Sequence, residues 1–143
     1  MTEADLGDLL PLARAYCDFY EVAPSDDELR SFSRALIAAP DQTGIQLIAR
    51  EEAGRAVGYA TVLWSYSSLS ASRIAIMEDL FVDPDWRGTG VADALIERCR
   101  HRARDTGATA LTWQTAKTNV RAQRVYERVG ARRTEWFDYS LDT

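Results

Sequence analysis

Histidine and cysteine, two residue types that often build chemical sites, are scarce in this 143-residue chain. Its one histidine, His101, lies in the charged run RCRHRARD, which predicts a solvated helix face. A histidine-rich metal site is therefore excluded, and a Ser-His-Asp triad would need this side chain to be buried. Cys17 and Cys99 have no CxxC spacing and fall in helical patterns. We expect both to be small buried hydrophobes rather than a disulfide, metal or nucleophilic site.

Long apolar runs and an excess of positive charge are also missing. No apolar run approaches the roughly 20 residues that a membrane span requires, and MTEADLGDLL lacks the basic region and apolar core of a secretory signal. The formal net charge is -5, and Lys117 is the only lysine. This balance argues against general affinity for nucleic acid, although it allows a local anion site. We expect a cytoplasmic protein without a membrane or nucleic-acid partner.

The length and the ordinary composition, 46% hydrophobic and 27% charged, predict one domain over residues 1–143. Ser25 and Glu28 form a capping box that opens a helix, and the order of periodic segments predicts a single α/β domain with a mixed sheet. Expected helices cover about 2–17, 25–39, 90–105 and 119–129. Expected strands cover about 45–51, 56–66, 74–82, 110–115 and 132–141, the last carrying Trp136, Phe137 and Tyr139.

The most informative stretch is DLFVDPDWRGTGVADALIERC, residues 79–99. Gly88 and Gly90 allow a ligand to approach the backbone closely, and a helix that starts here exposes unpaired N–H groups and the positive end of its dipole. Arg87 adds a planar cation suited to phosphate oxygens. These features predict a pyrophosphate cradle, or otherwise a structural turn. The stretch is neither a Walker P-loop nor GxGxxG.

Two blocks resemble the GCN5-related N-acetyltransferase (GNAT) family. Arg87–Ala92 matches the signature Q/R-x-x-G-x-G/A, and Glu78–Pro84 resembles the strand that precedes it. Asn119–Ala131 resembles the C-terminal block N-x-x-A-x-x-x-Y-x-x-x-G-A/F. The order of elements is similar across nearly the whole chain. It departs at the front, where the usual first strand is missing, and this leaves the sheet edge open to question but not the cofactor site.

The resemblance implies that acetyl-CoA is the cosubstrate and that no metal is needed. The pantetheine arm would pair with the central strand where the sheet splays. Asn119 would hydrogen-bond the pantetheine, cap a helix, or do both; Arg124 or Arg128 would reach the ribose phosphate or simply lie on a solvated face. The implied binding residues are Leu80, Val82, Arg87, Gly88, Thr89, Gly90, Val91, Ala92, Asn119, Ala122 and Tyr126.

Two residues carry the implied chemistry. Tyr126 has an ordinary pKa of about 10, so it keeps a proton that it can deliver to the CoA thiolate, unless it is only a core residue. Glu78 would remove the ammonium proton through a water, or anchor the amine, or else be a strand residue that faces solvent. On alternation Glu78 shares a face with Ile76, Leu80 and Val82, whereas Asp79 points away and is the weaker candidate.

The segments YCDFYE, LTWQTAKTN and TEWFDYSL resemble the histone/polyamine branch of the family. This favours a polyamine, diamine or lysine-like acceptor that attacks acetyl-CoA directly in a ternary complex. Acids in the loop CDFYEVAPSDDE, together with the aromatics Tyr20, Trp64, Tyr66, Trp136 and Tyr139, would suit a cationic amine, or would be ordinary caps and core. The alternatives are a protein- or antibiotic-directed enzyme and a non-catalytic acyl-CoA-binding regulator. An exposed aromatic final strand suggests a homodimer.

Overall fold

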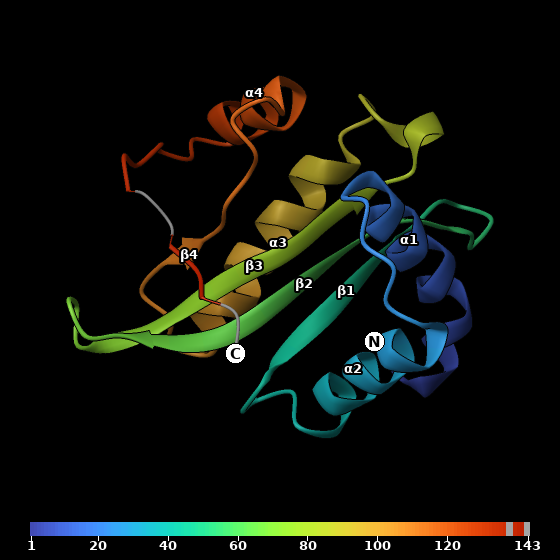
Figure 1. Cartoon of the computed structure of the whole chain (residues 1–143), viewed down its shortest axis with the longest axis horizontal. Helices are drawn as coiled ribbons and strands as arrows, with labels where there is room; N and C mark the ends of the chain where they lie inside the picture. The colour runs from blue at the N-terminus through green and yellow to red at the C-terminus, as the bar shows by residue number, and fades with distance from the viewer. Residues whose placement is uncertain (137–138, 142–143) are drawn as a thin grey trace.

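A computed structural model describes residues 1–136 and 139–141 of the chain. It has one four-stranded sheet in the order β1-β2-β3-β4, in which β1, β2 and β3 are antiparallel and β3 and β4 are parallel (Figure 1). The mixed α/β sheet expected from the sequence is confirmed. The elements are η1 (Glu3–Asp5), α1 (Leu6–Phe19), α2 (Asp26–Ala38), β1 (Gly44–Arg50), β2 (Ala56–Ser67), β3 (Ser72–Val82), η2 (Pro84–Trp86), α3 (Val91–Asp105), β4 (Leu111–Thr112) and α4 (Val120–Arg128).

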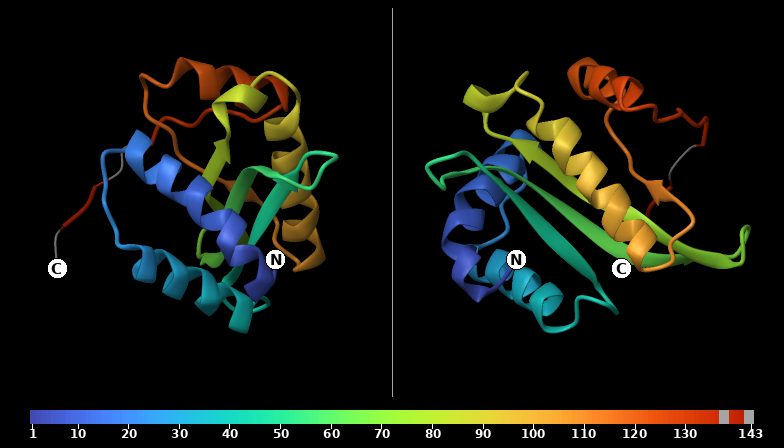
Figure 2. Two further views of the ribbon diagram at one scale, coloured as in Figure 1. Left: turned by 90° about the vertical axis from the view of Figure 1, so that its right-hand side faces the viewer. Right: turned by 180° about the vertical axis from the view of Figure 1, so that it is seen from behind.

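Helices cover both faces of the sheet and bury a hydrophobic cluster on each. α1 and α2 lie on one face and α3 on the other, as the two views of Figure 2 show. Leu9 of α1 packs with Tyr59 and Phe81 in the first cluster, and Cys99 of α3 packs with Met77 in the second. Burial of these apolar side chains is the main force that holds the layers together.

The helix starts follow local signals. Ser25 Oγ accepts a hydrogen bond from the Glu28 N–H, and the Glu28 carboxylate accepts one from the Ser25 N–H at 2.6 Å. The predicted capping box is therefore confirmed. Among the described residues no strand precedes α1, and a short 3-10 turn capped by Thr2 leads into it instead.

The C-terminal third departs from the prediction. β4 contains only Leu111 and Thr112, and it pairs with Ala75 and Ile76 of β3. The expected strand over 132–141 is wrong for its described residues, none of which is in a strand, and Phe137 lies outside them. Alternation is a local pattern, whereas a strand needs a neighbour to pair with, and the two-residue β4 offers almost no edge.

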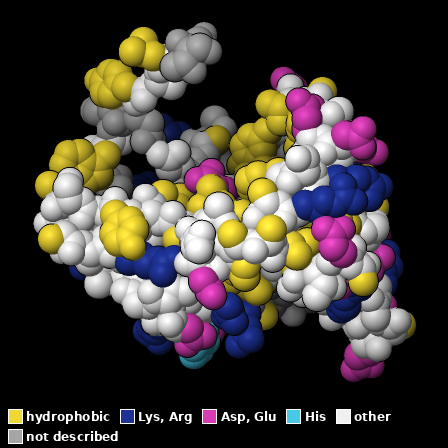
Figure 3. Space-filling view, turned by 90° about the horizontal axis from the view of Figure 1, so that it is seen from below, with side chains coloured by type: hydrophobic (Ala, Val, Ile, Leu, Met, Phe, Trp, Pro, Cys, Tyr) yellow, Lys and Arg dark blue, Asp and Glu magenta, His cyan; other side chains and the backbone are white. Residues whose placement is uncertain are grey.

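The surface agrees with the charge balance. Basic and acidic side chains lie side by side on the face drawn in Figure 3, where the single histidine sits at the surface among charged groups. His101 Nε2 lies 3.1 Å from a carboxylate oxygen of Glu97, one turn earlier in α3. The solvated position expected for His101 is confirmed.

None of the helices in the described part of the chain is both long enough and apolar enough to cross a membrane.

Gly58 on β2 lets α3 approach the sheet closely, so we predict that Gly58→Ala destabilises the fold. A Cβ at this position would lie 2.8 Å from the Phe81 carbonyl oxygen and 3.3 Å from a methyl group of Val91. We expect the free energy of unfolding to fall by about 1–3 kcal/mol, the usual effect of overpacking. Urea denaturation measures it. Gly7→Ala in α1 is the control, because a Cβ there meets nothing within 4 Å, and an equal loss in both variants would contradict the prediction.

Candidate active site

The turn between η2 and α3 forms an open cradle. Gly88 and Gly90 have φ angles of +81° and +93°, which disfavour any residue with a Cβ. A Cβ built on either glycine would meet nothing within 4 Å, so the space in front of this backbone is free. No side chain caps the first turn of α3 among the described residues. The N–H groups at the start of this helix are therefore available to an anion.

Arg87 is fixed beside this cradle. Its Nε donates to the Val82 carbonyl oxygen at 3.1 Å, and its guanidinium lies over the Phe81 ring, 6.0 Å from the centroid. Burial lowers the pKa of Arg87, and the charge of Arg121 lowers it further. Two guanidinium groups thus lie near each other at one cavity. An anion bound between them would remove their repulsion.

A cavity of about 340 Å³ opens from the cradle toward the middle of the sheet. It lies where β4 leaves β3: pairing ends at Ile76 and Thr112, and beyond that point Met77 and Trp113 both line the cavity. The structure thus brings most of the predicted site residues to one cavity. Those that line it are Glu78, Leu80, Val82, Arg87, Gly88, Gly90, Ala92, Asn119, Ala122 and Tyr126.

The other two predicted residues do not line the cavity. Thr89 turns its hydroxyl back to the Trp86 carbonyl oxygen, 2.6 Å away. Val91 packs against the hydrophobic cluster under α3. Each therefore has only its backbone N–H to offer a ligand.

Tyr126, on α4, lines the cavity. Its ring packs edge-on against Trp113, with the centroids 5.2 Å apart. Burial raises the pKa of Tyr126, the nearby Tyr20 raises it further, and the Thr115 hydroxyl close by acts in the opposite direction. The hydroxyl thus stays protonated at neutral pH, as a proton donor must. The packing role and the proton-donor role considered from the sequence are compatible.

Asn119 caps α4. Its Oδ1 accepts a hydrogen bond from the Ala122 N–H at 3.2 Å, and the side chain lines the cavity. The helix-cap interpretation is thus confirmed, and the side-chain amide group is left to face a ligand. Arg128 donates to the Asp93 carboxylate at 2.9 and 3.0 Å, which ties α4 to the first turn of α3. Arg124 lies exposed at the cavity rim.

Glu78 sits in a β-bulge. Thr61 pairs with Asp79 and Val62 pairs with Met77, so Glu78 has no partner on β2. The alternation argument for its direction is wrong, because Met77 and Leu80, three positions apart, pack in the same cluster. A bulge inserts one residue and resets the alternation after it. The Glu78 side chain is exposed and lines the cavity, as the sequence-based role requires.

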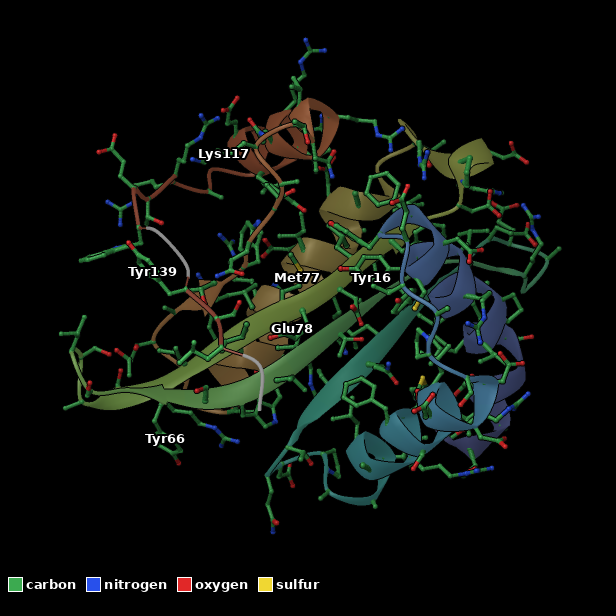
Figure 4. The ribbon with its side chains drawn as sticks, in the orientation of Figure 1. Tyr16, Tyr66, Met77, Glu78, Lys117 and Tyr139 are labelled. Atoms are coloured by element: carbon green, nitrogen blue, oxygen red, sulfur yellow. The ribbon has the colours of Figure 1, made fainter. Side chains whose placement is uncertain are left out.

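Sequence reasoning missed Tyr16, the residue that connects α1 to this bulge. Its hydroxyl donates to the Glu78 carbonyl oxygen at 3.1 Å, and Figure 4 shows the two residues meeting from α1 and β3. Helical periodicity placed Tyr16 only within the first expected helix, about 2–17. Such periodicity does not tell which group the tyrosine hydroxyl will bind.

The structure gathers only one of the aromatics expected around the acceptor. Tyr20 lines the cavity with Tyr16 and Phe19. Trp64 instead donates its Nε1–H to the Pro40 carbonyl oxygen at 2.6 Å. Tyr66 lies at the far end of the β2–β3 hairpin, and Tyr139 also stands away from Glu78 (Figure 4). Of the loop acids, Asp26 is engaged in an ion pair with Arg14.

Neither cysteine has the surroundings that activate a thiol. Both are free and buried. Burial raises the pKa of Cys17 and raises that of Cys99 to about 12, so each stays a thiol at neutral pH. In the described part of the chain no group of histidine, cysteine, aspartate and glutamate side chains is placed to hold a metal ion.

Comparison with known proteins gives one family. A model of the Acetyltransferase (GNAT) family matches residues 9–131. The uncharacterized N-acetyltransferase YhfO of Bacillus subtilis is 33% identical over 127 residues, which cover 89% of this chain and 83% of that protein. Thialysine N-epsilon-acetyltransferase of Bos taurus is 27% identical over 90% of this chain and 79% of its own length.

Solved structures agree on the fold. The crystal structure of a probable acetyltransferase superposes with a TM-score of 0.87 at 29% identity, over 100% of this chain and 95% of that one. Aminoglycoside N-acetyltransferase AAC(6')-Iy in complex with CoA has the same TM-score at 22% identity, over 99% of this chain and 91% of that one. The chain belongs to the acetyltransferase (GNAT) family, the acetyl-CoA-dependent N-acetyltransferases.

Proposed function

We propose that this enzyme transfers the acetyl group of acetyl-CoA to a small primary amine: a polyamine, a diamine or a lysine-like acceptor. The observation that carries the proposal is an exposed carboxylate, Glu78, at the aromatic end of the cavity. Tyr16 and Phe19 each pack against Tyr20 with centroids 5.0 Å apart. An ammonium group fits between aromatic faces and a carboxylate.

The remaining residues fit acetyl-CoA. The cradle of Gly88 and Gly90 with Arg87 and Arg121 suits the pyrophosphate. The edge of β3 that β4 leaves free suits the amide groups of the pantetheine arm, because unpaired backbone N–H and C=O groups seek partners. When bound, acetyl-CoA supplies the activated acetyl group as a thioester.

Two residues share the proton transfers of the reaction, one at the acceptor amine and one at the departing thiolate. The ammonium has a pKa of about 10.4 and must lose a proton before it attacks, so Glu78 anchors it or takes part in that loss. Tyr126 holds a proton at its Oη that it delivers to the departing thiolate. Attack is direct, because neither buried cysteine can carry the acetyl group.

An aminoglycoside is the second candidate acceptor. The aminoglycoside N(6')-acetyltransferase type 1 of Stenotrophomonas maltophilia is 27% identical over 78% of this chain and 72% of its own length. Such a polycationic sugar would call for several free acids around the cavity. Among the described residues that line the cavity, Glu78 is the only acid, which argues for the smaller amine.

The proposal predicts acceptor-dependent release of CoA from acetyl-CoA. A panel of spermidine, short diamines, lysine, a basic peptide and an aminoglycoside should show turnover with a small amine. Tyr126→Phe should lower kcat by about 10²–10⁴-fold, the usual contribution of a general acid, while acetyl-CoA still binds in calorimetry. Turnover with the aminoglycoside alone would favour the second candidate, and unchanged turnover in Tyr126→Phe would remove the proton-donor role.

The cradle predicts a difference between two glycines with the same backbone strain. Gly90 and Gly107 have φ angles of +93° and +78° and open space around them, at opposite ends of α3. Alanine at either should cost roughly 1–2 kcal/mol of stability. Only Gly90→Ala should weaken acetyl-CoA binding, by about tenfold, which is the loss of about one hydrogen bond to a charged group. Equal affinities in calorimetry would contradict the cradle.

We also propose a homodimer. Three large apolar side chains near the C-terminus are almost fully exposed: Trp136 at 82%, Tyr139 at 94% and Leu141 at 94%. Contact of so much apolar surface with water is unfavourable, and burial against a second copy of the chain would remove it. Light scattering should give twice the 16.0 kDa chain mass, and Trp136→Ser should shift it toward the monomer. A monomeric wild-type protein at high micromolar concentration would sink this proposal.

A further inference from the structure

A line of polar groups leads from two buried residues inside the sheet to two partly buried ones near the cavity. Gln46 Nε2 on β1 donates to Thr61 Oγ1 on β2 at 3.1 Å, and the two residues are 5% and 0% exposed. Thr61 lies directly opposite Asp79 in the β2–β3 register, and its hydroxyl lies close enough to the Asp79 carboxylate to lower its pKa. Tyr16 follows beyond Asp79 and lines the cavity.

Among the described residues, no positively charged group contributes to the pKa of Asp79. The titratable groups that face it in the described part of the chain are Glu78 on its own strand, Tyr16 and Cys17 on α1, and Tyr59 on β2. Burial raises the pKa of Asp79, the nearby Thr61 hydroxyl lowers it, the Glu78 charge raises it, and the Tyr16 hydroxyl lowers it. Asp79 is partly buried, and a carboxylate that is partly withdrawn from water without a cation costs stability. Packing alone therefore gives no reason for an aspartate at this position.

We propose that Asp79 receives the proton that the acceptor amine loses, and that the Tyr16 hydroxyl conducts this proton from the cavity, with Thr61 and Gln46 as positioning residues. The proposal rests on the proposed function and deepens it, since it leaves Glu78 as the amine anchor. It also gives the second carboxylate of the Glu78–Asp79 pair a role of its own.

Tyr16 is suited to conduct a proton rather than to keep one. Its hydroxyl donates to the Glu78 carbonyl oxygen and lies beside Asp79, and a hydroxyl hydrogen can rotate from one acceptor to the other. Burial and the nearby Asp79 charge raise the pKa of Tyr16, so the phenolate is not formed at neutral pH. A proton that reaches Oη must therefore move on as the original one leaves.

The step balances as follows. The ammonium passes one N–H proton to Tyr16 Oη while the Oη–H proton moves to the Asp79 carboxylate; the amine becomes neutral and Asp79 becomes a neutral acid. The amine lone pair then forms the N–C bond to the acetyl carbon and the C–S bond breaks, with the electron pair on sulfur. Tyr126 gives its proton to that sulfur and regains one from the acetylated nitrogen. Asp79 returns its proton to solvent through Tyr16.

The first test is the pH dependence of kcat/KM with the best amine of the panel. In Asp79→Asn the acidic limb should disappear and kcat should fall about 10²-fold. The Thr61 hydroxyl lowers the pKa of Asp79, so its removal in Thr61→Val should raise that pKa and move the acidic limb to higher pH. Thr61→Ser, which keeps a hydroxyl, should return the limb to its wild-type position. Glu78→Gln should raise KM for the amine and keep the limb. An acidic limb that survives in Asp79→Asn would overturn the proposal.

A second measurement does not depend on turnover. Carbon-13 NMR of the side-chain carboxyl groups, with Asp79→Asn to assign the signal, should show Asp79 titrating above the ordinary value of about 3.9. The midpoint should rise further in Thr61→Val and in Tyr16→Phe. Titration at the ordinary value, or no change in either variant, would overturn the relay. A failure of the proposed function would instead appear as no wild-type turnover on the whole panel, with this titration intact.

Stability separates a functional from a structural role. Because the folded pKa of Asp79 is raised, the wild-type protein loses stability as pH rises from the unfolded value of about 3.9 to the folded one, and the loss persists at neutral pH. Asp79→Asn escapes this loss, so its unfolding temperature at pH 7 should equal or exceed that of the wild type. A lower unfolding temperature in Asp79→Asn would mean that Asp79 stabilises the folded protein, which would contradict the proposal.

Discussion

The early end of the β3–β4 pairing is the constraint on which the site depends. Parallel pairing covers only Ala75 and Ile76, after which β4 and the chain beyond it turn away from the sheet. In the described part of the chain, β3 from Met77 to Val82 therefore has no pairing with β4, and the gap becomes the cavity. The Glu78 and Val82 carbonyl oxygens in this stretch accept hydrogen bonds from the side chains of Tyr16 and Arg87. Had the two strands stayed paired, the same residues would have closed the sheet. The cavity thus exists because β3 and β4 do not form backbone hydrogen bonds along this stretch.

Two local devices adapt β3 to this opening. The bulge at Glu78 brings a carboxylate to the cavity and still returns Leu80 and Val82 to the cluster under α3. Gly58, opposite Val82, lets the first turn of α3 lie close to the sheet, so that its N-terminal N–H groups stand at the mouth of the same cavity. Anion cradle, open strand edge and amine end therefore form one continuous site, which is what a thioester and an amine need in order to meet.

The sequence predicted the elements that carry strong local signals. The capping box at Ser25, the periodic helices and the Gly-rich turn before α3 appear where expected, because each depends on neighbouring residues alone. It failed for the strand over 132–141 and for the bulge at Glu78, which alternation did not predict. Pairing and bulges depend on a partner strand far away in the chain, and alternation along one segment cannot report them. Tyr16 was missed for a similar reason, since its partner is 62 positions away.

The sequence alone determined the chemistry that is available: glycines where φ is positive, an arginine beside them, a tyrosine on a short helix, adjacent acids on a buried strand, and no histidine or cysteine able to compete. Only the tertiary structure decided how these groups are used. It turned Glu78 to the cavity, enclosed Asp79 between Thr61 and Tyr16, and drew Tyr20 to the site while it left Trp64 and Tyr66 elsewhere. Side-chain identity is a property of the chain, whereas dielectric surroundings and neighbours arise only when distant segments pack together.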